Sequence, residues 1–369
     1  MNILFLDQFG ELGGAQRCLL DLLPALRDRG WGIHLAAPPG GQLAERAARF
    51  GATAYPIQCG PFSSGKKTLR DMTRFVLQSP HLAAEIRRLA QCCRADLLYV
   101  NGPRLLPAAS RAARHGPPLL FHSHSLLDGY VRRLAGRSLE RVSGTIIASS
   151  KFVARPLLDY SGDRGIRVIY NGVRQIRPTR RDPLGGEIRI GMIGRISPEK
   201  GQAEFLRAAR TLHTLMPHCR FVICGAPLFS DPAALRYSAA LNALAADLPV
   251  EFTGWQDRIA PILASLDLVI VPSGAIDATP RVIMEAFAAA VPVVAFASGG
   301  IPEIIEDGVT GFLVDRPSAP ALAFAIQKAL REPQRLREIG LAAQIRARGE
   351  FNLDRYRRQI IQAVETTLR

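Results

Sequence analysis

Short apolar runs and helix-like periodic segments alternate along the chain. Residues 2–6 (NILFL) form an apolar run, and residues 15–29 then place leucines three or four positions apart until Gly30. A second apolar run follows at 31–37 (WGIHLAA). A strand, a helix and a strand in this order predict a parallel sheet covered by helices.

The alternation continues to residue 172 and restarts after a break. Further strand candidates are 96–101, 117–124, 144–150 and 167–172, and then 188–194, 220–224, 250–254, 266–273, 292–296 and 311–314. The break at 174–187 is rich in Arg, Pro and Gly and lacks periodicity, which is typical of a linker. The last segment has Tyr356, Ile360, Val364 and Leu368 four apart and predicts an amphipathic helix.

These patterns predict an α/β protein with two Rossmann-like doubly wound domains. We expect residues 1–175 to form the N-terminal domain, 176–187 a linker and 188–350 the C-terminal domain. Residues 351–369 are expected to form a helix that packs back on the N-terminal domain. Ligands of such sheets bind beyond the carboxyl ends of the strands, so residues that follow strands are the candidates for function.

Composition and charge narrow the class of protein. The chain has 369 residues, 48% of them hydrophobic, which is enough for two cores and excludes disordered and fibrous classes. Its net charge of +15 is uneven: residues 1–186 carry 27 Lys and Arg against 13 Asp and Glu, and residues 187–369 carry 20 against 19. A basic half favours polyanionic partners such as anionic lipid, nucleic acid or a phosphorylated acceptor.

The sequence predicts a cytoplasmic protein without a bound metal. No apolar run reaches the roughly 18 residues of a membrane span, and the N-terminus lacks a basic region before its apolar run. The six cysteines form no C-x-x-C pair, so we expect reduced thiols. Apart from His122 and His124, the histidines do not fall at metal-ligand spacing.

Two pairs of candidate residues follow the first strand of each half. Gly13 and Gly14 come after the first run, and Arg195 and Lys200 lie in GRISPEKG (194–201) before a helical segment. A turn that leads into a helix favours anions, and two cations there favour a ligand with more than one negative charge. The alternative is that both side chains are solvated or paired with acidic neighbours at 199 and 204.

Two carboxylates follow a later strand. Asp277 and Glu285 lie eight positions apart in PSGAIDATPRVIMEA (272–286), where a loop leads into a helix. Carboxylates at this place in a doubly wound sheet commonly accept hydrogen bonds from ribose hydroxyls. The alternative for Glu285 is an exposed or capping position on the helix.

Six short motifs occur in order along nearly the whole chain. They are GGAQR (13–17), FHSHS (121–125), IYNGV (169–173), GRISPEKG (194–201), the segment from Asp277 to Glu285, and GGIPEIIEDGVTGFLVD (299–315). Together they resemble the ordered motifs of the retaining glycosyltransferases of family four, which have the GT-B fold of two domains facing a central cleft.

The resemblance implies a metal-independent, retaining hexosyltransferase that needs no cofactor. Its donor would be a nucleotide-diphosphate sugar, with uridine diphosphate favoured over guanosine diphosphate by family frequency. Arg195 and Lys200 would stabilise the leaving diphosphate. Glu285 would bind the ribose. His124 matches the family histidine near the reacting sugar, with His122 as the alternative, and either could instead be structural.

The glycines and one departure complete the implied site. Gly13 and Gly14 would let the backbone approach the sugar and phosphates, and Gly299 and Gly300 would open another helix towards them. The family usually has Glu where this chain has Asp277. Because the side chain is one methylene shorter, we expect an altered donor preference, with weakened catalysis as the alternative.

The basic N-terminal half suggests a membrane partner. Residues 63–79 form a basic amphipathic segment that could lie on an anionic membrane, or could be an ordinary solvated helix face. We expect a peripheral enzyme whose acceptor is a saccharide, in particular a lipid-linked saccharide in surface polysaccharide or glycolipid synthesis. The alternatives are a degenerate nucleotide-sugar-binding protein and a nucleic-acid-binding protein. The second is disfavoured because the basic half lacks aromatic-interleaved basic motifs.

Overall fold

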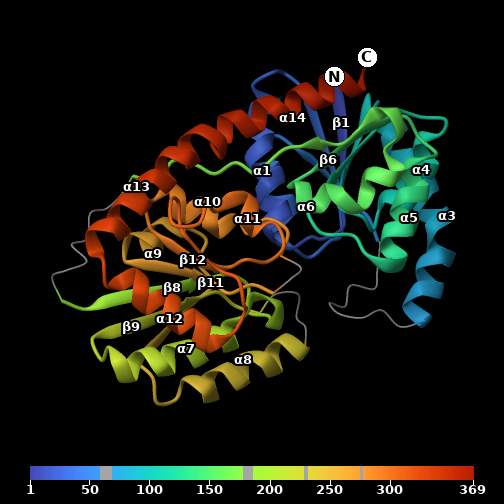
Figure 1. Ribbon diagram of the computed structural model, residues 1–369. Helices are drawn as coiled ribbons and strands as arrows, with labels where there is room; N and C mark the ends of the chain where they lie inside the picture. Colours follow the sequence, from blue (N-terminus) through green and yellow to red (C-terminus); the bar gives the residue numbers. More distant parts are fainter. Residues whose placement is uncertain (59–68, 178–185, 228–231, 275–276) are drawn as a thin grey trace. The chain divides into compact units, whose positions relative to one another are not determined.

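The computed structural model describes residues 1–58, 69–177, 186–227, 232–274 and 277–369 (Figure 1). Two compact units make up the chain. Unit 1 comprises Met1–Asn171 and Leu353–Arg369, and unit 2 comprises Gly172–Asn352. Most of the expected linker, residues 178–185, lies outside the described part of the chain.

The sheet of unit 1 has seven parallel strands in the order β3-β2-β1-β4-β5-β6-β7. Their bounds are β1 Asn2–Asp7, β2 Gly32–Ala37, β3 Thr53–Pro56, β4 Leu97–Asn101, β5 Leu119–Ser123, β6 Gly144–Ala148 and β7 Arg167–Val168. The strand order reverses between β1 and β4, so the topological switch point of this sheet lies at their carboxyl ends.

Helices cover both faces of this sheet. They are α1 Gly14–Arg27, α2 Gln42–Ala48, α3 Leu69–Cys92, α4 Leu106–Ala113, α5 Gly129–Leu139, α6 Lys151–Ala154, the 3-10 turns η1 Arg155–Tyr160 and η2 Gly162–Arg164, and α14 Leu353–Thr367. Alternate residues of β1 enter different cores: Ile3 and Phe5 pack with α1 and α14, whereas Leu4 and Leu6 pack with α3 and α4. Such a strand, buried on both faces, appears in the sequence as a continuous apolar run.

The C-terminal helix α14 belongs to unit 1. Ile360 and Val364 are fully buried in the core beside α1. The Tyr356 hydroxyl donates to the Cys18 carbonyl at 3.4 Å, and Arg357 Nε donates to the Asp21 carbonyl at 2.7 Å. The last helix of the chain therefore covers part of the first domain-sized unit (Figure 1).

Unit 2 repeats the same topology with six parallel strands, in the order β10-β9-β8-β11-β12-β13. Their bounds are β8 Ile188–Ile193, β9 Cys219–Cys224, β10 Val250–Gly254, β11 Leu268–Val271, β12 Val293–Phe296 and β13 Phe312–Val314. The order reverses between β8 and β11, so this sheet also has its switch point next to its first strand.

The helical segments of unit 2 again lie on both faces of its sheet. They are η3 Pro198–Lys200, α7 Gln202–Leu215, α8 Pro232–Ala245, α9 Ala260–Ala264, α10 Arg281–Ala288, α11 Ile301–Ile304, α12 Ala319–Leu330 and α13 Pro333–Glu350. Helices α7 and α12 share one core, where Phe205 packs with Phe221 of β9. Helix α10 packs against α13, and Gln344 Nε2 donates to the Ala288 carbonyl at 3.1 Å.

The structure confirms the expected α/β class with two Rossmann-like units. Every expected strand is present, although β7 covers only Arg167–Val168 of the run at 167–172. The sequence analysis missed β3. This edge strand is mostly exposed, so its sequence lacks the apolar run that marks the central strands. Among the described residues, no helix is both long and apolar enough to cross a membrane.

Candidate active site

Polar side chains gather at the switch point of unit 1. Asp7 ends β1 and lies opposite Asn101, which ends β4. The Asp7 carboxylate is fully buried and accepts three hydrogen bonds: from Asn101 Nδ2 at 2.6 Å, Gln16 Nε2 at 2.8 Å and the Phe9 amide at 2.9 Å. Burial raises the pKa of Asp7 to about 6, and these hydrogen bonds oppose the rise. The carboxylate is therefore ionised at neutral pH.

His124 lies just beyond β5 and is joined to this carboxylate through Asn101. Its Nε2 lies 2.8 Å from Asn101 Oδ1. Its Nδ1 is buried and has no hydrogen-bond partner among the described residues. Burial lowers the pKa of His124 to about 4, so the imidazole is neutral at pH 7.

His122 occupies a different environment on the same strand. Its ring lies beside that of His124, with centroids 3.8 Å apart, but its Nδ1 lies 2.7 Å from the Tyr99 hydroxyl. Burial, together with the neighbouring His124, lowers the pKa of His122 well below its ordinary value. The structural alternative considered for this histidine fits its fully buried bond to Tyr99.

The glycine loop after β1 is tied to the same cluster. The Gly13 amide donates to Gln16 Oε1 at 3.1 Å, while the other end of the Gln16 amide binds Asp7. A Cβ on Gly13 would lie 2.9 Å from Gln16 Oε1. Gly14 begins α1 and is exposed, and a Cβ there would meet none of the described atoms within 4 Å. The backbone at the start of α1 is therefore accessible to a ligand.

In unit 2, the loops that follow β8 and β11 are joined by an ion pair. Lys200 Nζ lies 2.5 Å from Asp277 Oδ2, and their side chains are 26% and 12% exposed. The Gly274 amide also donates to the Glu199 carbonyl at 2.8 Å. Gly201 adopts a φ of +80°, and a Cβ there would lie 2.0 Å from the Pro272 carbonyl oxygen. Only glycine fits this close approach of the two loops.

The loop after β12 joins the same group. The Gly300 amide donates to the Asp277 carbonyl at 3.1 Å. Gly299 has a φ of +57°, and a Cβ there would lie 2.0 Å from the same oxygen. Asp277 is therefore held by Lys200 through its side chain and by Gly300 through its backbone. Three neighbouring strands of the sheet contribute to this arrangement.

Arg195 and Glu285 each have an acidic or basic partner close in sequence. Arg195 forms an ion pair with Glu199, and Gln202 Nε2 donates to the Arg195 carbonyl at 2.8 Å. Glu285 Oε1 lies 2.9 Å from Arg281 Nε, and both side chains are about 15% exposed. The structure therefore agrees with the alternative in which Arg195 pairs with Glu199. It does not agree with the alternative in which Glu285 is exposed, because that side chain is only about 15% exposed.

The expected residues thus fall into two groups. Gly13 and His124 are connected within unit 1, and Lys200, Asp277 and Gly300 within unit 2. The side chains that connect the first group were not predicted from the sequence: Asp7, Gln16 and Asn101. Asp7 and Asn101 are polar residues at the ends of buried strands, a signal that could have revealed them.

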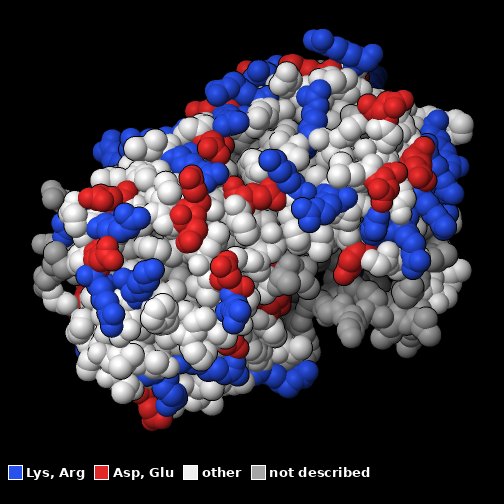
Figure 2. Space-filling view, viewed as in Figure 1, with Lys and Arg blue, Asp and Glu red and all other residues white. Residues whose placement is uncertain are grey.

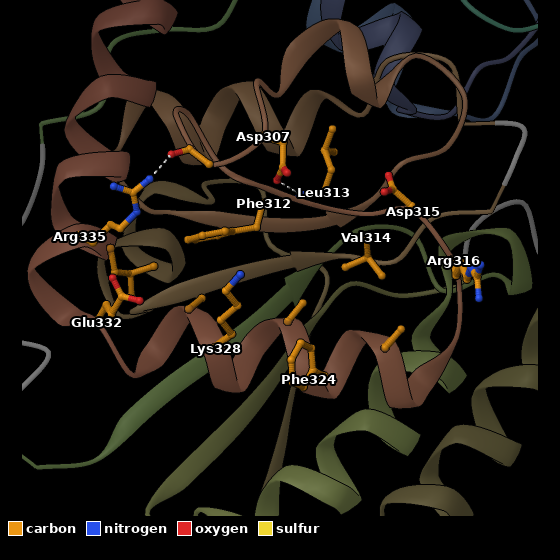
Figure 3. Close-up of a pocket in the computed structure, with 15 residues that line it drawn as sticks. Asp307, Phe312, Leu313, Val314, Asp315, Arg316, Phe324, Lys328, Glu332 and Arg335 are labelled. Atoms are coloured by element: carbon orange, nitrogen blue, oxygen red, sulfur yellow. Dashed lines mark hydrogen bonds between the residues drawn. The ribbon is translucent and has the colours of Figure 1, made fainter.

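Other features of the described structure do not belong to these groups. No set of three His, Cys, Asp or Glu residues within the described ranges is placed to hold a metal ion, and metal independence stays a prediction. A hollow of about 380 Å³ lies between β13, α12 and the start of α13 (Figure 3). Phe312, Phe324 and Lys328 help to line it, and its described lining contains none of the expected site residues.

Both halves of the chain match described families. Residues 12–175 match Glycosyltransferase Family 4, and residues 178–346 match Glycosyl transferases group 1. The structure resembles that of HepE from Anabaena in complex with UDP and glucose, with a TM-score of 0.84 and 26% sequence identity over 99% of this chain and 100% of HepE.

Curated relatives are similar over different lengths. A D-inositol 3-phosphate glycosyltransferase of Mycobacterium leprae is 36% identical over 181 residues, which are 47% of this chain and 40% of that protein. The chain spans less than half of the length of several curated relatives that it matches, including this one. A GDP-mannose-dependent alpha-(1-6)-phosphatidylinositol monomannoside mannosyltransferase of Mycolicibacterium smegmatis is 26% identical over 310 residues, 76% of this chain and 78% of that protein.

The fold and these matches define the class: the chain has the GT-B fold, and each of its halves carries a glycosyltransferase domain. The chain belongs to glycosyltransferase family 4, and its second half carries the group 1 domain.

Proposed function

We propose that this protein transfers a sugar, with retention of configuration and without a metal, from a nucleotide-diphosphate sugar to a saccharide acceptor. The observation that carries the proposal is the group of loops after β8, β11 and β12, which brings Lys200 and Asp277 together at the carboxyl edge of the sheet. Ligands of doubly wound sheets bind at this edge.

The cations of unit 2 would bind the diphosphate. Lys200 and Arg195 already have carboxylate partners, Asp277 and Glu199, so binding would exchange these contacts for phosphate oxygens. Negative charge grows on the leaving diphosphate in the transition state, and fixed cations stabilise that state more than the bound donor. The Glu285 carboxylate, oriented by Arg281, would accept hydrogen bonds from the ribose.

The remaining groups would bind the sugar. Asp277, released by Lys200 when the diphosphate binds, would accept a sugar hydroxyl, and the hydrogen bond from the Gly300 amide holds its backbone in position. In unit 1, Gly13 and Gly14 would allow the substrate to approach the backbone at the start of α1. His124 would contact a sugar hydroxyl through its unpaired Nδ1.

The retaining mechanism would rely on the leaving group. No side chain in the proposed roles acts as a covalent nucleophile, and the leaving phosphate would assist attack of the acceptor on the same face of the sugar. The two cations and the backbone amides would supply the charge stabilisation that a metal provides elsewhere. Family membership supports this proposal.

Uridine diphosphate is the carrier we propose. HepE, similar over its whole length, has been crystallised with UDP and with UDP-glucose. A thermal-shift panel of nucleotide sugars and free nucleotides tests this, because a ligand that binds only the folded state raises the apparent stability. We expect UDP compounds to raise the melting temperature most. A shift with guanosine compounds alone would correct the base, and no shift with any nucleotide would contradict the function.

A degenerate binding protein predicts a different result. It would bind the donor but release no sugar. An assay of slow hydrolysis of the best-binding nucleotide sugar, measured by the release of free nucleotide, separates this alternative from the proposed enzyme. Only the enzyme should release nucleotide. Nucleic-acid binding gains no support from the described structure, and we do not expect it.

The acceptor we propose is a lipid-linked saccharide at an anionic membrane. A relative named above acts on phosphatidylinositol monomannoside, and a 34% identical relative over 148 residues is a lipopolysaccharide 1,2-N-acetylglucosaminetransferase of Salmonella typhimurium. The basic amphipathic segment indicated by the sequence, residues 63–79, lies largely outside the residues whose side chains are described. Support from the described residues therefore comes from α5.

Helix α5 presents apolar and basic side chains together. Tyr130 and Val131 are 43% and 44% exposed, and Arg133 and Arg137 lie four residues apart on the same helix, both exposed. Arg141, also exposed, follows two residues after the helix ends at Leu139. Lys and Arg side chains are visible over this part of unit 1, interspersed with acidic ones (Figure 2). Each cation near an anionic surface contributes roughly 1 kcal/mol to binding.

Liposome flotation at low salt tests the membrane proposal. We expect recovery with anionic vesicles and not with neutral ones, and weaker recovery after Arg133→Ser combined with Arg137→Ser. Arg49→Ser is the control, because Arg49 is an exposed arginine at the end of α2, just after Ala48, and pairs with Glu45. Equal recovery with neutral and anionic vesicles would remove the membrane role.

A further inference from the structure

A chain of hydrogen bonds joins three neighbouring strands beneath His124. Asp7 of β1 binds Asn101 of β4 at 2.6 Å, and Asn101 binds His124, beyond β5, at 2.8 Å. Asp7 and Asn101 are 0% and 2% exposed. Buried polar groups held in this way have fixed orientations, because each alternative leaves a buried group unpaired.

The chemistry of the groups sets the direction of this chain. An ionised carboxylate only accepts hydrogen bonds, so Asn101 must turn its amide nitrogen towards Asp7. Its amide oxygen then faces His124 and can only accept, so His124 Nε2 carries the proton. The Nδ1 atom of this neutral imidazole is left as a hydrogen-bond acceptor.

We propose that Asp7 and Asn101 are positioning residues that fix His124 in the Nε2–H tautomer, so that Nδ1 accepts a hydrogen bond from a sugar hydroxyl. This rests on the proposed function, in which His124 contacts the sugar. Nδ1 is buried and unpaired among the described residues, so it lacks the partner that a buried polar atom requires. A substrate hydroxyl would supply that partner.

The neighbouring titratable groups belong to a separate bond. His122 lies against the His124 ring, and Tyr99 lies beneath it on β4, but these two residues bind each other at 2.7 Å. Burial raises the pKa of Tyr99, so its hydroxyl keeps its proton. Gln16 binds the other oxygen of Asp7, which leaves one oxygen for Asn101.

The variant Asp7→Asn reverses the direction of the chain. Its amide oxygen can keep the bonds from Gln16 and the Phe9 amide, both of which reach the same oxygen of Asp7. The new NH₂ group then faces Asn101, which must rotate to accept it. Asn101 now donates to His124 Nε2, and the imidazole proton moves to Nδ1. Mutation of the partners that orient a metal-bound histidine typically costs about ten- to a hundredfold in activity, and we expect a loss of the same size here.

The experiment reads the tautomer directly by two-bond ¹H–¹⁵N correlation NMR of histidine-labelled protein, with His124→Gln to assign the signal. We expect Nε2–H in the wild type and Nδ1–H in Asp7→Asn. The swap of Asp7→Asn with Asn101→Asp places the carboxylate beside His124, and should restore Nε2–H and part of the turnover. Tyr99→Phe, which removes the neighbouring buried bond, should leave the His124 tautomer unchanged.

Measurements of nucleotide binding distinguish the positioning role of Asp7 and Asn101 from the proposed function. UDP affinity should be the same in Asp7→Asn and the wild type, because the phosphate-binding residues lie in unit 2, while turnover falls about ten- to a hundredfold. An Nδ1–H wild type, or an unchanged tautomer in folded Asp7→Asn, would overturn the positioning role alone. Absence of nucleotide binding and transfer in the wild type would overturn the proposed function, and with it the sugar contact.

Discussion

Single charged residues at the carboxyl edge of unit 2 hold one another in place before any substrate binds. Lys200 faces Asp277, and Arg281 faces Glu285, in pairs whose side chains are about a quarter exposed or less. Removing one member of such a pair leaves the other partly buried and unpaired, which costs more than an exposed pair would. The pairs fix the side chains in place, and under the proposed function a diphosphate would have to compete with the carboxylates for the cations.

The first prediction concerns the cations. Lys200→Ala and Arg195→Ala should each lower turnover by about a hundredfold or more, because each removes a positive charge that would stabilise the leaving diphosphate. Steady-state release of nucleotide measures this. Arg207→Ala is the control, since Arg207 pairs with Glu204 on the exposed side of α7. Unchanged turnover in both site variants would contradict the phosphate role.

The second prediction concerns the pH dependence of stability. The pKa of His124 falls from 6.5 to about 4 on folding, so the unfolded chain takes up a proton first as the pH drops. His124 therefore lowers the free energy of unfolding between pH 6.5 and 4, by about 3 kcal/mol in total. Asp7 acts in the opposite sense: its raised pKa lowers stability as the pH rises from 3.8 to 6.

Urea unfolding from pH 7 to 4 measures the effect. His124→Gln should lose less stability on acidification than the wild type, while Asp7 and His122 contribute to both proteins. His115→Gln is the control, because His115 is exposed. Parallel curves for His124→Gln and the wild type would show that the buried imidazole does not resist protonation.

The motifs named candidate residues, and the alternative interpretation paired Arg195 with Glu199, but the other partners were not predicted. The GRISPEKG motif indicated Arg195 and Lys200, yet the Lys200–Asp277 pair joins positions 77 apart, which only the neighbouring strands β8 and β11 bring together. The i,i+4 pair of Arg281 and Glu285 was accessible from the helical spacing. The buried Asp7–Asn101 bond required the register of β1 against β4.

At the scale of elements, the loops of unit 2 depend on glycines at their points of contact. Gly201 and Gly299 both have positive φ, and both face a carbonyl oxygen of another loop at 2.0 Å from a notional Cβ. The helix and strand periodicities that predicted the central elements carry no information on such contacts. The same limit explains the missed β3, whose exposed residues show no apolar run.

The third prediction follows from this packing. Gly201→Ala should lower the free energy of unfolding by more than the roughly 1–2 kcal/mol that a left-handed conformation costs, because the Cβ also meets the Pro272 oxygen. Gly349→Ala is the matched control in the exposed last turn of α13, where alanine should be neutral or stabilising by about 0.5–1 kcal/mol. Chemical denaturation measures both, and equal stabilities would contradict the close approach.

At the scale of the whole molecule, the same strand order is used twice in one chain, but the two units are closed differently. Unit 2 is one continuous segment, Gly172–Asn352. Unit 1 is made of two segments, because helix α14, which follows unit 2 in the chain, also belongs to it. The four-residue spacing of Tyr356, Ile360 and Val364 indicated that this helix needs a surface, and the structure shows all three buried against unit 1. This agrees with the expectation that the helix packs back on the N-terminal domain, although the spacing could not name the residues that it contacts.

The fourth prediction separates the units by their tryptophans. Trp31 lies in unit 1 and Trp255 in unit 2, and the chain has two in all. Ile360→Ala should lower the stability of unit 1 by about 2–5 kcal/mol, since Ile360 is fully buried in its core. Fluorescence of Trp31, with Trp255→Phe, should report an earlier unfolding transition. An equal shift reported by Trp255, with Trp31→Phe, would contradict this assignment.

The late return of the chain to unit 1 has a consequence for synthesis. All of unit 2 is synthesised before α14. Until α14 is available, the apolar surface that includes Leu19 and Leu22 of unit 1 is not covered by that helix. That apolar surface is open to aggregation and to chaperones until α14 covers it. Unit 1 can therefore be completed only after the whole of unit 2 has been synthesised.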